Sequence, residues 1–129
     1  KGDIWHALKS TDKGYVGFGE AYFSSIKSGE VKGWKRHNRF TLNMVVPVGA
    51  VKFVIYDDRL ESKTKGQFKE FVLSPKGNYS RLCIEPGLWL AFVGVGDSYS
   101  LLLDIIDEVH CANEADKKEL NEIPYNFFL

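Results

Sequence analysis

Hydrophobic and polar positions along the chain form short segments, most of which alternate with a period of two and end at Gly or Pro. This period is typical of strands with one buried face, and the Gly and Pro residues indicate turns. We predict that two of the strands form a hairpin joined at Gly49. Strands at this spacing with little helix predict an all-β fold, either a sandwich or a barrel. The predicted strands are residues 15–26, 31–38, 40–48, 51–56, 68–73, 81–84, 88–95 and 99–106.

Residues 113–122 are the one segment with a helical pattern. Asn113 is suited to cap a first helical turn, and Glu114 and Asp116 follow where the positive end of a helix favours acids. Pro124 lies just beyond and would stop further helix. We therefore predict one short helix near the C-terminus.

The segment Val31–Asn38, read VKGWKRHN, is the densest run of cationic and imidazole side chains in the chain. Because side chains of a strand alternate between faces, Lys35 and His37 share one face and Trp34 and Arg36 share the other. Burying a cation is costly unless water or a ligand meets it. Two interpretations stay open: the Lys35 face is outward and solvated, or it forms the floor of a polar pocket.

Composition and charge restrict the function further. The chain has 129 residues, 44% of them hydrophobic and 26% charged, as expected for a single globular domain spanning 1–129. Equal numbers of basic and acidic residues give zero formal net charge, which argues against nucleic acid or a membrane surface as the partner. No apolar run reaches the ~20 residues that span a bilayer. The two cysteines form no disulfide or zinc pattern, and we expect a cytoplasmic location.

Proton transfer is the chemistry that the sequence best supports. His6, His37 and His110 are scattered without a ligand spacing, so no metal site is predicted. Nucleophile-elbow and phosphate-loop motifs are absent. His37 is the natural proton carrier near neutral pH. Glu20 stands between apolar neighbours, either as an exposed partner of a lysine or as a hydrogen-bond acceptor in a pocket.

Four segments, taken in order, resemble a known family. They read VKGWKRH, VPVGAVKFVIYDDR, ESKTKGQF and EPGLWLAF, and together they resemble the RmlC-like cupins of the dTDP-4-dehydrorhamnose 3,5-epimerase family. Upstream, GFGE resembles the family's RGxFxE strand and implies Phe18 and Glu20 on the nucleotide side. The resemblance covers the chain from Gly14 onward. It implies a cupin-type jelly-roll β-barrel, a homodimer, a nucleotide-activated 4-keto sugar as ligand, and no metal or redox cofactor.

The chain departs from the epimerase pattern at positions that carry chemistry. The His of the family's RGLH strand corresponds to Lys35, and the His of a later strand corresponds to Leu90. A pocket Lys corresponds to Leu42, and the family's acidic Tyr falls on Leu103 or Asp104. These changes put the family's standard 3,5-epimerase chemistry in question for this chain.

A second group, the dTDP-sugar 3,4-ketoisomerases, resembles the chain at other positions. Its RGxHAH strand is similar to KGWKRH, with Lys35 at the first His and His37 at the second. Trp89 is similar to a Trp that follows the Pro-Gly of that group. This match is shorter than the epimerase match, so the resemblance implies a divergent epimerase-like protein, with a ketoisomerase as the alternative.

The reactions of the two families share one step, in which a proton next to a ketone is removed and the resulting enolate is stabilised. We predict His37 as the base and Lys35 as the enolate-stabilising group or partner acid, in deoxysugar and surface polysaccharide (O-antigen) biosynthesis. A non-catalytic cupin that binds sugar nucleotides is the alternative from another class. In the expected homodimer, Trp5 and Tyr15 lie near the interface. The predicted substrate-binding residues are Phe18, Glu20, Lys32 (at the pyrophosphate), Arg36, Trp89 and Asp104.

Overall fold

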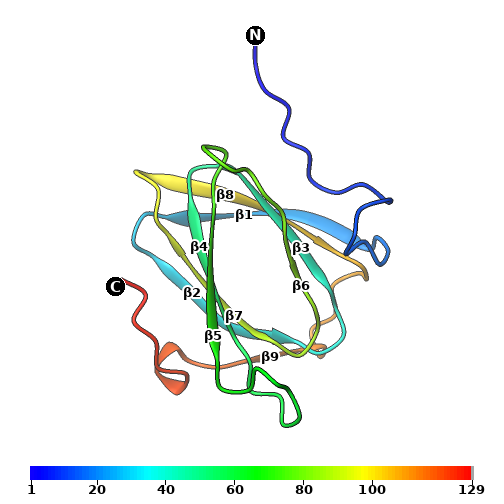
Figure 1. The fold of residues 1–129 in the computed structure, drawn as a ribbon, viewed down its shortest axis with the longest axis vertical. Helices are drawn as coiled ribbons and strands as arrows, with labels where there is room; N and C mark the ends of the chain where they lie inside the picture. The colour runs from blue at the N-terminus through cyan, green and yellow to red at the C-terminus, as the bar shows by residue number, and fades with distance from the viewer. Residues whose placement is uncertain (129) are drawn as a thin grey trace.

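The computed structural model of the protein describes residues 1–128, and its regular secondary structure is almost entirely β-strand (Figure 1). They form two antiparallel sheets, one with the order β1-β8-β3-β6 and the other with the order β5-β4-β7-β2-β9. The predicted all-β class is confirmed. The elements are β1 (Glu20–Lys27), β2 (Val31–His37), β3 (Leu42–Val48), β4 (Val51–Tyr56), β5 (Phe68–Leu73), β6 (Leu82–Ile84), β7 (Trp89–Gly94), β8 (Tyr99–Ile106), β9 (Ala115–Lys117) and the 3₁₀ turn η1 (Leu120–Glu122).

Apolar side chains bury both faces of the second sheet. Between the sheets, residues such as Phe40, Met44 and Phe53 form one continuous core. On the outer face, Trp34 and Trp89 pack with residues of the C-terminal tail, and the indole Nε1 of Trp34 donates to the carbonyl of Ile123 at 3.1 Å. The N-terminal residues extend away from the strands (Figure 1). The second sheet is thus fixed from both sides, which gives β2 a rigid base.

The predicted hairpin at Gly49 is wrong, because β3 and β4 belong to different sheets. Gly49 has φ +81°, a left-handed conformation that glycine adopts readily, and a Cβ there would lie 2.2 Å from Oγ of Ser100. The glycine therefore marks the point where the chain crosses from one sheet to the other. Alternation predicts each strand but not the sheet it joins.

The predicted C-terminal helix is also wrong, apart from the single 3₁₀ turn η1. Residues 115–117 instead form β9, which pairs with the edge of β2. Asp116 accepts from Arg36 at 2.7 Å, and Glu114 bonds to His37. These contacts with β2 override the weak local preference for helix, as tertiary context commonly does.

Candidate functional site

An irregularity in β2 places three of its polar side chains on one face. Lys32 pairs with Phe92 and Lys35 pairs with Leu90, with a register shift between them. At the shift Gly33 lies against β7, where a Cβ would be 2.4 Å from the Cβ of Ala91. A bulge of this kind re-aims the side chains that follow it. Lys32 therefore faces the space between the two sheets together with Lys35 and His37, while the indole of Trp34 packs on the outer face of the second sheet.

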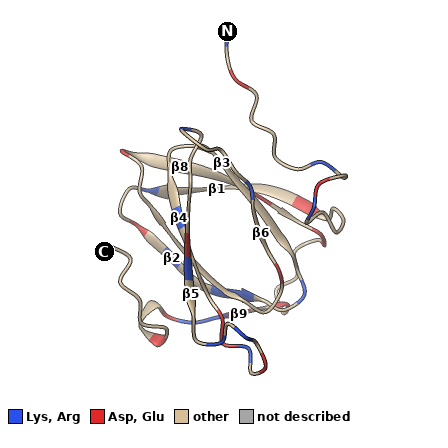
Figure 2. Cartoon of the chain, in the orientation of Figure 1, with Lys and Arg blue, Asp and Glu red and all other residues tan. Residues whose placement is uncertain are grey.

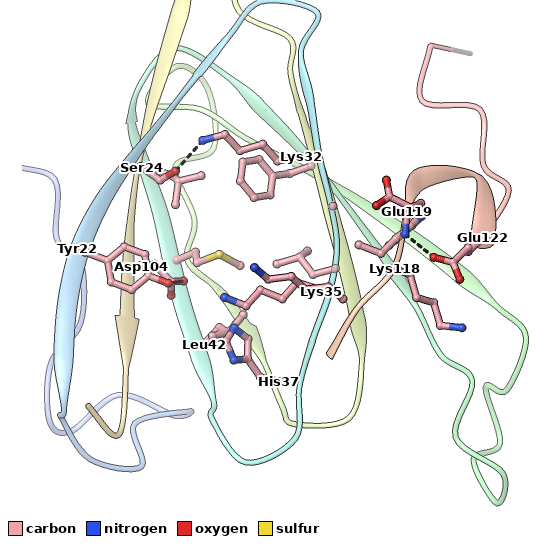
Figure 3. Close-up of a pocket in the computed structure, with 17 residues that line it drawn as sticks. Tyr22, Ser24, Lys32, Lys35, His37, Leu42, Asp104, Lys118, Glu119 and Glu122 are labelled. Carbon is pink, nitrogen blue, oxygen red and sulfur yellow. Dashed lines mark hydrogen bonds between the residues drawn. The ribbon is translucent and has the colours of Figure 1, made fainter. Parts of the chain in front are cut away.

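These side chains line a cavity of about 490 Å³ between the two sheets (Figure 3). Its volume falls in the range of small-molecule sites, which combine an apolar lining with a few convergent polar groups. The apolar lining includes Leu42, Met44, Leu90, Phe92 and Leu102. The polar lining includes Tyr22, Ser24, Lys32, Lys35, His37, Asp104 and Lys117.

His37 is held by a buried carboxylate. Its Nδ1 lies 2.6 Å from Oε1 of Glu114, whose side chain is 1% exposed. The other oxygen of Glu114 accepts the backbone N–H groups of Arg39 and Phe40, at 2.8 and 3.1 Å. Burial opposes ionisation of Glu114, but the hydrogen bonds from His37 and from the two amides outweigh it and hold the pKa of Glu114 below its usual value. An ionised Glu114 needs a donor at Nδ1, which leaves Nε2 as the nitrogen able to accept a proton.

Asp104 and Tyr22 form a second polar pair on the opposite sheet. They are register partners on β8 and β1, and the Tyr22 hydroxyl donates to Oδ2 of Asp104 at 2.9 Å. Asp104 is 6% exposed. Burial raises the pKa of Asp104 to about 6, against the opposing effects of the Tyr22 hydrogen bond and the Lys35 charge. Burial and the neighbouring Asp104 also raise the pKa of Tyr22, so this phenol stays protonated at neutral pH.

Cations of the second sheet supply positive charge to the cavity. Lys32 donates to the carbonyl of Ser25 at 2.7 Å and to Oγ of Ser24 at 3.2 Å. Lys117 stands directly opposite Lys35 in the β2–β9 ladder and lines the same cavity. Within residues 1–128, neither Lys35 nor Lys117 forms an ion pair. Figure 2 shows Lys and Arg positions along β2 and on β9. The arrangement suits an anionic ligand or an anionic intermediate.

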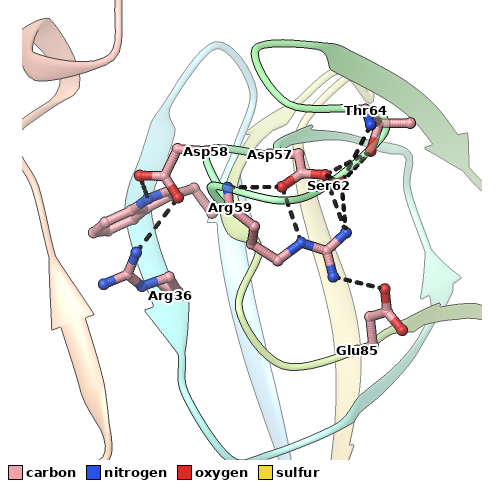
Figure 4. Close-up of polar contacts among 8 residues, drawn as sticks. Arg36, Asp57, Asp58, Arg59, Ser62, Thr64 and Glu85 are labelled. Carbon is pink, nitrogen blue, oxygen red and sulfur yellow. Dashed lines mark hydrogen bonds and ion pairs between the residues drawn. The ribbon is translucent and has the colours of Figure 1, made fainter.

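Four of the sequence-predicted site residues meet in the cavity and four do not. Those that line it are Lys32, Lys35, His37 and Asp104. Arg36 and Trp89 stack on the outer face of the second sheet, with the guanidinium 4.7 Å from the ring centroid, and both bond to Asp58 (Figure 4). The side chain of Phe18 is exposed just before β1, and Glu20 accepts the backbone N–H of His110. The catalytic and binding roles of all eight residues stay predictions.

The positions at which the chain departs from the epimerase pattern lie close together in the structure. Lys35, Leu42, Leu90 and Asp104 (one of the two candidates for the position of the acidic Tyr) are far apart in sequence and all line this cavity. The changed positions therefore cluster in one site and are not spread over the molecule.

Sequence reasoning missed three residues of the site. Tyr22 follows Glu20 by two positions in a predicted strand, a period that would have indicated an inward side chain. Lys117 and Glu114 were assigned to a helix, so nothing connected them to β2. Only the pairing of β9 with β2 brings them to His37 and Lys35.

Two further observations concern membrane-spanning helices and metal sites, neither of which the sequence predicts. No helix within residues 1–128 has both the length and the apolar character needed to cross a membrane. In the same range, no three His, Cys, Asp or Glu side chains gather in a way that could hold a metal ion.

Comparison with known proteins decides the family. No family model matches the chain. The solved dTDP-sugar isomerase of Desulfovibrio desulfuricans is 34% identical, with a TM-score of 0.89 over 94% of this chain and 78% of that one. The chain belongs to the RmlC-like family of dTDP-sugar isomerases and epimerases. The resemblance seen in the sequence is thus confirmed.

Two more relatives of this RmlC-like chain extend the comparison. A Haloferax volcanii protein named "Probable low-salt glycan biosynthesis epimerase Agl13" is 31% identical over 107 residues, which are 82% of this chain and 66% of that protein. The dTDP-4-dehydrorhamnose 3,5-epimerase of Bacillus anthracis, solved with TDP and pyrophosphate bound, is 23% identical, with a TM-score of 0.72 over 81% of this chain and 61% of that one. At this identity the second similarity shows the fold alone. The chain thus spans about two thirds of the length of these two proteins.

Proposed function

We propose that the protein is an isomerase or epimerase of a nucleotide-activated 4-keto-6-deoxy sugar and acts in deoxysugar and surface-glycan biosynthesis. The observation that carries this proposal is the His37–Glu114 pair on a cavity wall that also presents Lys35. A histidine oriented by a buried carboxylate is a general base suited to neutral pH. The relatives support the substrate class, because their names describe a dTDP-sugar isomerase and a glycan biosynthesis epimerase.

In this mechanism His37 removes the proton and Lys35 stabilises the product of that step. Nε2 of His37 takes the proton from the carbon next to the ketone, and the electron pair of the broken C–H bond moves to the carbonyl oxygen. Glu114 stabilises the imidazolium that forms. The ammonium of Lys35 lies where it can stabilise the enolate oxygen in a site with an apolar lining, where such a charge acts more strongly than in water.

The remaining residues are proposed to hold the nucleotide. Lys32 meets the pyrophosphate from inside the cavity, and Phe18 and Glu20 lie on the nucleotide side. Arg36 and Trp89 lie behind the cavity wall, so any direct contact with the ligand needs a route around the edge strand β9. The ligand's charge is then met mainly by lysines, which bind phosphate as point charges.

A homodimer and the jelly-roll form of the barrel belong to the same proposal. Strands β1 to β8 cross repeatedly between the two sheets, which supports the predicted jelly roll. Ile4 and Phe23 are 82% and 65% exposed, on the N-terminal arm and on β1. Apolar side chains left exposed in this way suit a surface that a second copy covers, near the predicted contacts of Trp5 and Tyr15. A cytoplasmic location stays a prediction.

Two alternative functions are distinguishable from this one. A 3,4-ketoisomerase is favoured by the solved isomerase relative and by His37 at the second His position of that group. A non-catalytic sugar-nucleotide-binding protein is favoured by the altered positions at Lys35, Leu42 and Leu90. Only an enzyme exchanges the protons next to the ketone with solvent, and only a ketoisomerase moves the ketone to the neighbouring carbon.

The experiment measures deuterium uptake from heavy water into a panel of dTDP-4-keto-6-deoxy sugars. We expect uptake with the wild type and a fall of about 100- to 10,000-fold in His37→Asn, the range that general-base catalysis supplies. The control is His110→Asn, which replaces an exposed histidine outside the cavity and should keep wild-type uptake. Binding of dTDP without any uptake by the wild type would identify a binding protein. Retention of more than about half of the uptake in His37→Asn would remove the base assignment.

A further inference from the structure

Two pairs of charged residues face each other along the ladder between β2 and β9, one on each side of the second sheet. On the cavity side Lys35 stands opposite Lys117, and neither forms an ion pair within residues 1–128. On the outer side Arg36 stands opposite Asp116, and its Nη2 donates to Oδ2 of Asp116 at 2.7 Å. Like charges directly opposite each other destabilise strand pairing, whereas opposite charges stabilise it. The outer pair therefore opposes the repulsion that the cavity-side pair creates.

Arg36 is a fixed point on the outer face. Its guanidinium lies 4.7 Å from the ring centroid of Trp89, a cation–π contact, and its Nη1 lies 3.4 Å from Oδ1 of Asp58 (Figure 4). Trp89 is buried in the outer apolar cluster, and its Nε1 donates to the other oxygen of Asp58 at 2.9 Å. An arginine held in this way gives Asp116, and with it β9, a preferred place along β2.

Asp116 connects Arg36 to the histidine–carboxylate pair of the cavity. Its Oδ2 also accepts from the side-chain amide of Asn38 at 3.0 Å, and the same amide nitrogen donates to the backbone carbonyl of Glu114 at 2.9 Å. Glu114 comes directly before β9, and its Oε1 lies 2.6 Å from Nδ1 of His37. Because β9 has only three residues, short for a strand, the position of the Glu114 carboxylate depends on these side-chain contacts as well as on backbone pairing.

We propose that the ion pair of Arg36 with Asp116 positions the general base from behind the cavity wall, by holding β9 on β2 so that Glu114 meets His37. This inference rests on the proposed function and deepens it, because it assigns Arg36 to positioning rather than to contact with the ligand. Neither Arg36 nor Asp116 is among the described residues that line the cavity. Both act through Glu114, which keeps Nδ1 of His37 as the donor and leaves Nε2 to accept the proton.

The first test separates positioning from binding. Asp116→Ala removes the acceptor of both Arg36 and Asn38, so β9 loosens and the base loses its alignment. We expect deuterium uptake at saturating substrate to fall by about 10-fold, less than the roughly 100-fold that a misplacement of about 1 Å can cost. The dissociation constant of dTDP should stay within about twofold of the wild-type value, because positioning, unlike binding, does not involve contact with the nucleotide. Asp116→Glu restores a carboxylate and should recover most of the uptake.

The matched control is Glu108→Ala. Glu108 accepts from Nε of Arg39 at 2.7 Å, the same length as the Arg36–Asp116 contact, and the Glu108 and Asp116 side chains are 42% and 49% exposed. Each substitution removes one solvent-accessible ion pair, which typically changes stability little. Because Glu108 lies outside β9, Glu108→Ala should keep wild-type uptake. An equal fall in both variants would show a general effect of lost ion pairs and overturn the inference.

A second measurement needs no substrate. The Nδ1–H proton of His37 lies in a short hydrogen bond to a carboxylate, so it should give a downfield proton NMR signal. Its exchange with water reports how often the pair with Glu114 opens locally. We expect exchange about 10-fold faster in Asp116→Ala than in wild type, and at the wild-type rate in Glu108→Ala. An ion pair that only adds stability would lower the melting temperature and leave this exchange as in the control.

The remaining outcomes each decide one claim. Uptake within about twofold of wild type in Asp116→Ala, or unchanged exchange of the His37 proton, overturns the positioning role and leaves the proposed function intact. Binding of dTDP weakened by about 10-fold, with uptake at saturation unchanged, would make Arg36 and Asp116 part of the binding site and also overturn it. If the wild type shows no uptake with any substrate of the panel, the proposed function falls whatever the NMR result.

Discussion

Asp57 and Asp104 are both buried, at 4% and 6% exposure, yet their surroundings are opposite. Asp57, just after β4, accepts from the backbone and side chain of Arg59 and from the hydroxyls of Ser62 and Thr64 (Figure 4). The Arg59 guanidinium holds the pKa of Asp57 well below its usual range, with help from the two hydroxyls and against the effect of burial. Within residues 1–128, Asp104 has one donor, Tyr22, and an oxygen without a partner, and its pKa is raised.

The difference separates a structural acid from a candidate functional one. Every oxygen of Asp57 is used inside the protein, and Arg59 is further fixed by Glu85 at 3.0 Å, so the loop after β4 is locked. Asp104 has hydrogen-bonding capacity that residues 1–128 leave unused. Equal burial therefore gives no information about role, whereas the completeness of hydrogen bonding does.

The comparison predicts its largest effect at Asp57. Asp57→Asn removes the charge that pairs with Arg59 and leaves the two hydroxyls with a poorer acceptor. We expect a loss of about 3 to 4 kcal/mol in the free energy of unfolding, the range for breaking a buried ion pair, with the lower end favoured because Arg59 is partly exposed. Urea denaturation followed by tryptophan fluorescence measures this loss. A change under about 1 kcal/mol would show that the network is dispensable for stability.

In contrast to Asp57→Asn, Asp104→Asn should raise the free energy of unfolding, and it should do so only above about pH 4. The folded pKa of about 6 lies above the ordinary value of 3.8, so between these values the folded state binds more protons than the unfolded state. The contribution of Asp104 to the free energy of unfolding is therefore fully present below about pH 4 and is lost as the pH rises through about 6.

Replacing Asp104 by the neutral amide removes this loss. We expect Asp104→Asn to be about 3 kcal/mol more stable than wild type at pH 8 and about equal to it at pH 4, since the pKa rises from 3.8 to about 6 and one pKa unit corresponds to ~1.4 kcal/mol. Denaturation curves across this pH range measure the difference. A difference between the two proteins that does not depend on pH would contradict a raised pKa at Asp104.

The sequence predicted the face of β2 but not the partners of that face. A period of two was sufficient to place Lys35 and His37 together and Trp34 with Arg36 on the other side. Lys32 needed the bulge at Gly33, because simple alternation puts it with Trp34. The bulge depends on close packing against Ala91 of β7, a contact that no local pattern contains.

Pairing between distant strands accounts for the rest of the difference. Tyr22 meets Asp104 across 82 residues, and His37 meets Glu114 across 77. Local propensity favoured a helix around Glu114, and pairing with the edge of β2 decided otherwise. The resemblance identified the positions where the chain departs from its family, whereas only the fold showed which distant residues meet at those positions.

A third, smaller effect concerns the charge that moderates Asp104. Lys35 lowers the pKa of Asp104, so Lys35→Met should raise that pKa above about 6 while keeping the apolar stem of the side chain. Carbon-13 NMR titration of the aspartate carboxyls would show the shift. Lys63→Met, in the exposed loop after β4, is the matched control and should leave the titration unchanged. An unchanged Asp104 titration in Lys35→Met would show that the Lys35 charge does not act on Asp104.

The smallest expected effect is on nucleotide binding. Arg59 is held by ion pairs with Asp57 and Glu85, whereas Lys32 and Lys117 form no ion pair within residues 1–128. Lys32→Met and Lys117→Met should each weaken dTDP binding by about two- to fivefold, the range for a single solvent-accessible charge pair. Binding should also weaken as salt rises, because at ~0.1 M salt charges more than ~10 Å apart are largely screened. Calorimetry at two salt concentrations measures both effects, with Lys63→Met as the control. Because Lys117 stands opposite Lys35 on β9, wild-type affinity in Lys117→Met would mean that this edge strand shapes the cavity without contacting the diphosphate.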